Sequence, residues 1–258
     1  MSETFPRPTR SLAGRVAIVS GAGAAGDGIG NGRASAILLA EAGCSVVCTD
    51  MKLGLAQKTV EVIEQDGKVV NVVGIGGATG TAVDVDMEQW AKSMEINVAS
   101  MVLMSKYSIP AMEKNEGLQC RGSIVNIASV AGIRGGNPHL LYPTSKGAIV
   151  NMTRAMAVHH GPSGIRVNCV CPGMVYTPMM YAPGMSDTAR AARRDRSILK
   201  TEGTGWDVGA AVRFLAGDEA RWMTAVILPV DAGATAEAGS MLPKEAMTNP
   251  GGQSDMPS

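Results

Sequence analysis

The segment Arg15-Val-Ala-Ile-Val-Ser-Gly21-Ala-Gly-Ala-Ala-Gly-Asp-Gly28-Ile-Gly30-Asn-Gly-Arg33 decides the fold class of this chain. Its apolar first part predicts a buried parallel strand, and the run Ala-Ser-Ala-Ile-Leu-Leu-Ala that follows it predicts a helix. A glycine-rich loop can be only a flexible turn. Between a strand and a helix, however, glycines let backbone amides and the helix N-terminus approach a pyrophosphate. This position therefore favours a phosphate-binding loop.

The rest of the chain repeats the alternation of strands and helices. Besides the first strand at 15–20, the sequence predicts strands at 45–50, 69–74, 123–128, 165–171 and 225–230. Helices are predicted at 54–65, 87–113, 142–160 and 206–216. This order predicts an α/β fold with a doubly wound parallel sheet of six strands.

Length, composition and charge indicate one domain and limit the classes of partner. We expect a single domain over 12–237, with flexible tails at 1–11 and 238–258. The net charge is zero and the pI is near 6.8, so neither nucleic acid nor a membrane is an expected partner. No apolar stretch approaches the ~18 residues of a membrane span. The N-terminus also lacks the apolar core of a signal peptide, and a cytoplasmic protein is expected.

The cysteines predict no metal site. The chain has five cysteines without a C-x-x-C pair, and Cys169 and Cys171 flank Val170 in a predicted strand. We interpret them as buried free thiols in a reducing compartment.

Three further residues indicate chemistry. Tyr142 and Lys146 stand four residues apart in a predicted helix, so their side chains share one face. A neighbouring ammonium favours the tyrosinate, which makes Tyr142 a better acid or base near neutral pH. Ser129 follows the strand at 123–128, at the edge where ligands bind in open α/β sheets. Alone, the pair could be a surface Tyr and Lys on an amphipathic helix. The glycine loop and Ser129 favour a catalytic set.

Jointly, these motifs resemble the short-chain dehydrogenase/reductase family from about Leu12 to Ala234. The family's T-G-x-x-x-G-x-G motif is matched with Ser20 in place of Thr and with a spacer three residues longer. Asn71-Val-Val-Gly74 is similar to the family's N-N-A-G element. The segment that begins at Pro172 is similar to the family's P-G-x-V-x-T element. The cofactor-binding residues that the resemblance implies are Gly21, Gly28, Ile29, Gly30, Asp50, Asn71, Gly74, Tyr142, Lys146, Pro172, Val175 and Thr177.

Asp50 bears on the choice of cofactor. It ends the second predicted strand, where a carboxylate accepts hydrogen bonds from the adenosine ribose and repels a 2′-phosphate. NAD is therefore expected rather than NADP, although Lys52 could tolerate a phosphate. A purely helix-capping Asp50 is the weaker alternative, because Met51-Lys52 starts no obvious capping box.

The resemblance also implies the reaction, hydride transfer between NAD and a secondary alcohol or ketone. Tyr142 would exchange the proton on the substrate oxygen, Lys146 would hold the nicotinamide ribose, and Ser129 would hydrogen-bond the substrate oxygen. Asn97 matches the family's helix asparagine that anchors a water linked to Lys146; a solvent-facing Asn97 is the alternative.

Two features outside the catalytic set are interpreted in more than one way. The arginines of a predicted mobile flap at 179–200 are taken as a solvated face, with an anionic substrate as the alternative.

The resemblance implies a homodimer or homotetramer built on the helices at 87–113 and 144–160. The methionines of the first helix would serve the core, that interface or both: Met94, Met101, Met104 and Met112.

One strand-helix unit of the family, on the order of 30 residues, is missing between residues 66 and 70. The right-handed crossover rule then places the helix at 54–65 on the face of the sheet opposite to its usual one. The strand at 45–50 would become an exposed edge. The alternative function is therefore a catalytically impaired or inactive subunit, or a truncated product, with weak cofactor binding.

Overall fold

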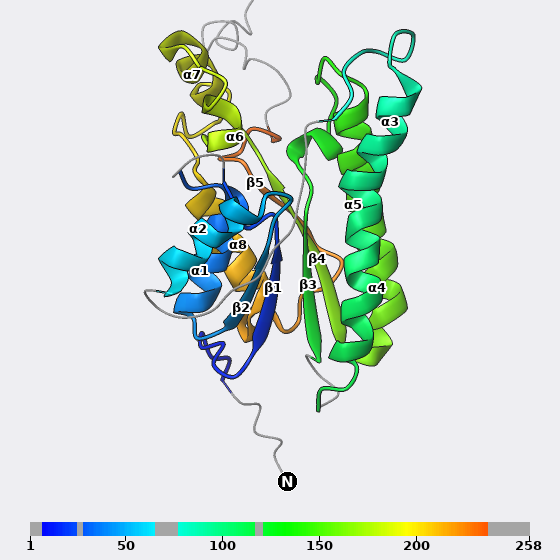
Figure 1. Cartoon of the computed structure of the whole chain (residues 1–258), viewed down its shortest axis with the longest axis vertical. Coiled ribbons are helices and arrows are strands. Elements are labelled where there is room, and N and C mark those ends of the chain that lie inside the picture. Colours follow the sequence, from blue (N-terminus) through cyan, green and yellow to red (C-terminus); the bar gives the residue numbers. More distant parts are fainter. Residues whose placement is uncertain (1–6, 25–27, 65–76, 117–120, 237–258) are drawn as a thin grey trace, which may run out of the picture.

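The computed structural model describes residues 7–24, 28–64, 77–116 and 121–236. Within these ranges, parallel strands form the central layer and helices cover both of its faces (Figure 1). The predicted doubly wound α/β class is confirmed. The strand predicted at 69–74 lies outside the described residues, so the count of six strands stays a prediction.

The strands belong to two parallel groups in the described part of the chain. In the first, β1 (Val16–Ser20) pairs with β2 (Ser45–Thr49). In the second, β4 (Ile165–Pro172) lies between β3 (Gly122–Ile127) and β5 (Ile227–Val230). Every residue of β4 is buried, which accounts for its nearly continuous apolar sequence.

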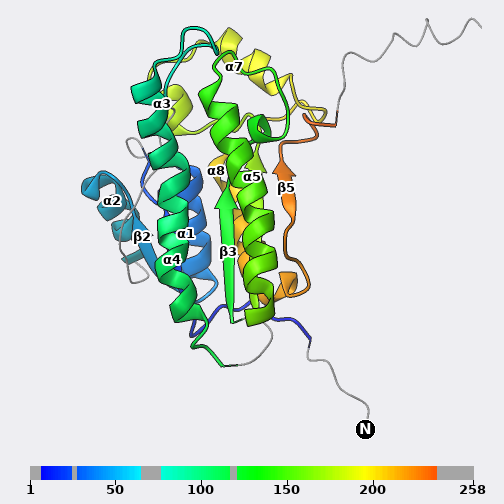
Figure 2. The same ribbon diagram turned by 90° about the vertical axis from the view of Figure 1, so that its right-hand side faces the viewer.

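The long helices divide between the two faces. On one face, α1 (Asn31–Glu41) packs between α2 (Leu53–Glu64) and α8 (Gly205–Ala216). On the other, α4 (Ser100–Met112) and α5 (Leu141–His160) cover β3 (Figure 2). None of the helices in the described ranges is long and apolar enough to cross a membrane.

The position of α2 corrects the expectation drawn from the crossover rule. α2 lies on the same face as α1 and contacts β2 (Figure 1), so the predicted change of face is wrong. Its side chains Ala56, Val60 and Ile63 are buried, and Ile63 belongs to the core cluster that includes Val19 of β1 and Ile37 of α1. The Thr59 hydroxyl also donates to the carbonyl of Ala22, 2.7 Å away. These local contacts hold α2 on this face.

The shorter α-helices lie above the carboxyl ends of the strands (Figure 1). The helix predicted over 87–113 is α3 (Met87–Met94), a π-helical turn η1 (Glu95–Ala99) and α4. The flap contains α6 (Pro178–Tyr181) and α7 (Asp187–Arg194). Single 3₁₀ turns are found at η2 (Val130–Gly132), η3 (Gly161–Ser163) and η4 (Asp218–Ala220).

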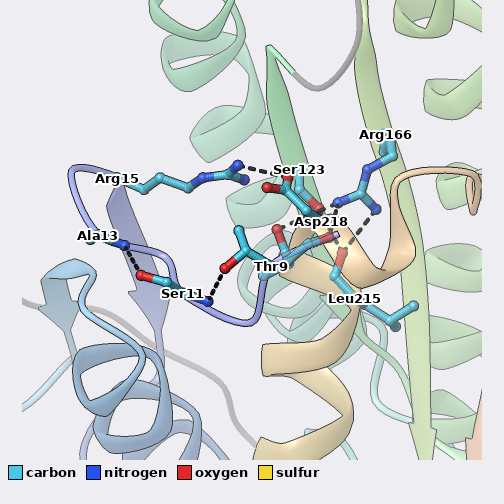
Figure 3. Close-up of polar contacts among 10 residues, drawn as sticks. Thr9, Ser11, Ala13, Arg15, Ser123, Arg166, Leu215 and Asp218 are labelled. Carbon is cyan, nitrogen blue, oxygen red and sulfur yellow. Dashed lines mark hydrogen bonds and ion pairs between the residues drawn. The ribbon is translucent and has the colours of Figure 1, made fainter. Parts of the chain in front are cut away.

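A buried arginine stabilises the opposite end of the fold, where the strands begin and α8 ends. Arg166, near the start of β4, donates to the carbonyls of Leu215 and Gly217 at the end of α8, at 2.9 and 3.1 Å (Figure 3). A cation at this helix end satisfies carbonyls that lack helical partners. Arg15 pairs with Asp218 beside it, at 2.6 Å. α8 is thereby held with its N-terminus toward the carboxyl ends of the strands.

Candidate active site

The predicted site residues gather at the carboxyl edge of the sheet. The glycine loop follows β1, Asp50 follows β2, Ser129 follows β3, and the segment to Thr177 follows β4. This is the edge at which ligands bind in open α/β sheets. Asn71 and Gly74 lie outside the described residues, as do residues 25–27 within the loop.

The glycine loop permits a close approach between β1 and α1. Gly21 has φ of +72°, and a β-carbon at Gly32 would lie 1.7 Å from the Gly21 carbonyl oxygen. The amides of Gly21 and Ala22 donate to the Thr49 carbonyl at 3.0 and 3.1 Å, which ties the loop to β2. Any side chain at position 32 would push α1 away from the loop.

Asp50 binds the loop directly. Its Oδ2 accepts from the Gly23 amide and its Oδ1 from the Lys52 amide, both at 3.1 Å. The second contact lies just before α2, so the helix-capping interpretation describes part of the role of Asp50. The first contact fixes the loop over the end of β2. Its role toward a ribose stays a prediction.

A buried arginine that sequence reasoning missed supports the loop from below. Arg33 is 2% exposed. Its Nη1 donates to the Gly28 carbonyl at 2.7 Å, and its Nε donates to the Thr59 hydroxyl at 3.0 Å. Arg33 thus connects the loop to α2. The sequence carries one sign of this role. Arg33 lies among small and apolar residues of a predicted helix, and these residues prove to be buried.

These features fit the phosphates of a dinucleotide. α1 begins after Gly30 without a side-chain cap and without an acidic residue in its first turn. Its first amides can therefore bind an anion. Asn31 Oδ1 and Thr49 Oγ1 are buried and have no hydrogen-bond partner in the described part of the chain. Buried polar atoms normally have partners, so both atoms suit a ligand contact.

The catalytic candidates lie on two elements that touch. Tyr142 and Lys146 lie in the first two turns of α5, with Lys146 Nζ 5.7 Å from the Tyr142 ring centre. Ser129 caps η2, and its Oγ accepts from the Ala131 amide at 3.2 Å, so its own proton stays free for donation. A β-carbon at Gly132 would lie 2.5 Å from the backbone carbon of Lys146. The Ser129 turn therefore packs against the helix that carries the other two residues.

The ammonium of Lys146 has an unusual environment. Its Nζ donates to the Ile127 carbonyl at the end of β3, 3.2 Å away. Burial lowers the pKa of Lys146 to about 8, and Cys169 and Cys171 act in the opposite direction. The two thiols are buried and free, 4.0 Å apart, as the sequence predicts.

Asn97 is a buried residue, so the solvent-facing alternative is wrong. It lies in the π-helical turn η1, and its Nδ2 donates to the Ser145 hydroxyl at 3.5 Å. Ser145 in turn donates to the Tyr142 carbonyl at 3.0 Å. Single π turns often occur at functional sites, because they redirect one side chain from the helix ladder. Here the turn directs Asn97 toward α5.

The segment after β4 reaches the same edge. The Gly173 amide donates to the Val230 carbonyl at 2.9 Å, and a β-carbon at Gly173 would lie 2.6 Å from that of Asp231. Val175 packs partly buried against the main core, and Thr177 is buried at the start of α6. Pro172, Val175 and Thr177 thus follow one another toward the glycine loop.

The flap rests on that loop. Tyr181 Oη and Pro178 Cγ would lie 2.0 and 2.6 Å from a β-carbon at Gly28. The rings of Tyr181 and Tyr176 stack with their centres 4.7 Å apart. Arg190 covers the other ring, with its guanidinium carbon 3.9 Å from the Tyr176 centre. Sequence reasoning gave no sign of these contacts, because aromatic residues in a polar flap have no periodic pattern.

Comparisons with known proteins agree with this fold. A family model described as enoyl-(acyl carrier protein) reductase matches residues 66–235. The chain is 35% identical over 182 residues to meso-2,3-butanediol dehydrogenase of Serratia marcescens, covering 69% of each protein. It is 33% identical over 260 residues to 2-(S)-hydroxypropyl-CoM dehydrogenase 3 of Xanthobacter autotrophicus, covering 87% of this chain and 98% of that one. A solved structure assigned as a short-chain dehydrogenase/reductase of Burkholderia xenovorans superposes with a TM-score of 0.78 at 33% identity, over 88% of this chain and 99% of that one.

Proposed function

The chain belongs to the short-chain dehydrogenase/reductase family, and on that premise we propose that it is a nicotinamide-dependent oxidoreductase for secondary alcohols and ketones. The observation that carries the proposal is the contact between two elements. The turn that begins at Ser129 packs on α5 beside Lys146, one helical turn from Tyr142. Acid–base groups thereby converge next to a loop that fits a dinucleotide.

Different residues at the carboxyl edge of the sheet bind different groups of the cofactor. The loop from Gly21 to Gly30 and the first amides of α1 hold the pyrophosphate. Val175 and Thr177 contact the nicotinamide carboxamide, and Lys146 donates to the neighbouring ribose. When bound, the nicotinamide supplies the acceptor or donor of the hydride.

Asp50 would make NAD the preferred form of the cofactor. Its carboxylate lies beside the loop at the end of β2, where it can accept from the ribose hydroxyls. A 2′-phosphate there would meet a like charge. Lys52 is the nearest compensating cation along the chain, and its contribution sets how strict the preference is.

Tyr142 moves the proton of the reacting oxygen. In the oxidation direction it accepts the hydroxyl proton, and in reduction it returns that proton to the oxygen. Lys146 favours the deprotonated form of Tyr142 through its charge. Ser129 donates to the substrate oxygen and stabilises negative charge that develops on it. Asn97 positions the α5 backbone through Ser145 and holds water near Lys146.

A second copy of the chain is the proposed partner. On α4, the apolar side chains of Val102, Leu103 and Tyr107 are 48%, 51% and 74% exposed. By contrast, Met101 and Met112 pack against buried core clusters, so these two methionines serve the core. The exposed set fits an interface between copies, and light scattering should then give the mass of a dimer or tetramer.

Turnover assays test the reaction itself. Purified protein is incubated with NAD⁺ or NADP⁺ and 2-butanol, 2,3-butanediol or cyclohexanol, and with NADH or NADPH and the matching ketones. The reduced nucleotide is followed by its absorbance, with the Tyr142→Phe variant as the control for background. We expect turnover of at least one pair that the variant loses. Nucleotide binding without turnover in either direction would favour the inactive subunit instead.

A further inference from the structure

We propose that the hydroxyl of Tyr181 in the flap donates a hydrogen bond to the pyrophosphate of the bound dinucleotide. The inference rests on the proposed function and adds to it a phosphate ligand from outside the glycine loop. The ring of Tyr176 stacks on Tyr181 and holds it in place. Tyr181 is thus a cofactor-binding residue, and Tyr176 is a positioning residue.

The Tyr181 hydroxyl lies against the glycine loop. A β-carbon at Gly28 would be only 2.0 Å from Tyr181 Oη and 2.6 Å from Pro178 Cγ. These distances leave no room for a side chain at position 28, so the phenol oxygen is next to the loop backbone. α1 begins three residues later, at Asn31. The hydroxyl therefore lies close to the helix end whose first amides are proposed to hold the pyrophosphate.

This hydroxyl is available to a ligand. Tyr181 is partly buried, and its hydroxyl forms no hydrogen bond with the chain in the part that the structure describes. Its surroundings favour an anion, because Arg33 donates to the Gly28 carbonyl at 2.7 Å and the first turn of α1 has no acidic residue. A phenol that donates to a phosphate oxygen forms a charge-assisted hydrogen bond, which is stronger than a neutral one.

A series of side-chain contacts fixes the Tyr181 ring. Its centre is 4.7 Å from that of Tyr176, with 33° between the two ring planes. The guanidinium carbon of Arg190 lies 3.9 Å from the Tyr176 centre. Arg190 in turn donates from two nitrogens to Glu202, at 2.7 and 2.5 Å. A side chain that is already held in place loses little conformational freedom when it binds a ligand, so this stack favours the phosphate contact.

The backbone places Tyr181 in line with a second proposed cofactor contact. Thr177, proposed to contact the nicotinamide carboxamide, precedes Tyr181 by four residues, and the Tyr181 amide donates to the Thr177 carbonyl at 3.2 Å. Side chains at this helical spacing lie on the same face. The nicotinamide ribose of a dinucleotide is linked directly to the pyrophosphate. One face of α6 can therefore contact the cofactor at both groups.

Ligands with and without the pyrophosphate test the contact. Isothermal titration calorimetry gives the Kd of NADH, ADP-ribose and adenosine for the wild type and for Tyr181→Phe, which keeps the ring and removes the hydroxyl. We expect the Kd values of NADH and ADP-ribose to rise by the same factor, about 10- to 100-fold, because a hydrogen bond to a charged group is lost. The Kd of adenosine should not change. Tyr107→Phe on α4 is the control and should keep all three values within about twofold.

The other outcomes separate this contact from the proposed function. Unchanged binding of NADH by Tyr181→Phe, or a loss for NADH that ADP-ribose does not share, would overturn the contact and leave the function standing. A loss of the same size for adenosine would also overturn it, because the substitution would then disturb the whole site. A wild-type protein that binds neither NADH nor ADP-ribose would reject the function together with the contact.

The positioning role of Tyr176 has its own test. Tyr176→Leu removes the stacked ring and should raise the Kd of ADP-ribose about 2- to 10-fold, the range that an aromatic pair contributes. Tyr176→Phe keeps the ring and should restore the wild-type value. In the Tyr181→Phe protein, Tyr176→Leu should have no further effect, because the hydroxyl that the stack positions is absent. An equal effect in both proteins would show that Tyr176 does not act through Tyr181.

Discussion

Tyr142→Phe is expected to lower kcat by about 10²- to 10⁴-fold, the range in which a positioned acid–base group contributes. The substitution removes one hydroxyl from a partly buried side chain in the first turn of α5 and keeps the ring beside Lys146. The fold and the affinity for NADH should therefore change little. Steady-state kinetics on the best alcohol of the panel, together with a nucleotide titration, measure both effects.

Tyr107→Phe is the matched control, because it removes the same atom from an exposed tyrosine on α4. Its kcat should stay within about twofold of the wild type, because the substitution keeps the ring that fills the proposed interface between copies and removes no group of the candidate active site. If Tyr142→Phe retained a similar activity, the proton would have to be moved by another group, and the assignment of Tyr142 would be wrong.

Lys146→Met is expected to have the second largest effect, and it changes activity and stability together. Loss of the charge beside Tyr142 and of the ribose contact should reduce kcat/KM by about 10²-fold or more. Stability should respond through pH. The pKa of Lys146 is about 8 in the folded chain against 10.5 for the ordinary side chain, because burial disfavours the ammonium.

The sign of the pH effect follows from proton binding. Between about pH 8 and 10.5 the unfolded chain holds the Lys146 proton and the folded chain has lost it, so stability rises with pH in this window. Below about pH 8 both states are protonated and the folded chain bears the full cost of the buried charge. The free energy of unfolding of wild type minus that of Lys146→Met should increase by up to about 3 kcal/mol across the window. Urea unfolding of both proteins at pH 7.5 and 10.5 measures it, and a constant difference would refute the buried ammonium.

Local patterns in the sequence predicted the parts of the site that one segment can specify. The glycine loop after β1 and the pair Tyr142 and Lys146 depend on spacing within a few residues, and each is found where the pattern placed it. Ser129 was also placed correctly, because the end of the strand is visible as the end of an apolar run.

Features that depend on contacts between distant segments escaped the sequence. The face chosen by α2 follows from side chains such as Thr59, which bonds a carbonyl 37 residues away. The support of the loop by Arg33 and the position of Tyr181 on Gly28 are of the same kind. The π-helical turn at Asn97 inserts an irregularity into a helix whose sequence looks continuous. Periodicity reports which side of an element is apolar, and it does not report which neighbour that side meets.

Binding of NADH tests the central claim most directly, because it asks whether the glycine loop, Asp50 and α1 form a working cofactor site although the sequence predicts the loss of one strand-helix unit between residues 66 and 70. Purified protein is titrated with NADH and with NADPH while nucleotide fluorescence and the thermal midpoint are followed together. The account predicts saturable binding of NADH with a rising midpoint, since a ligand stabilises by RT ln(1 + [L]/Kd), and a much smaller response to NADPH. No response to either nucleotide would contradict it.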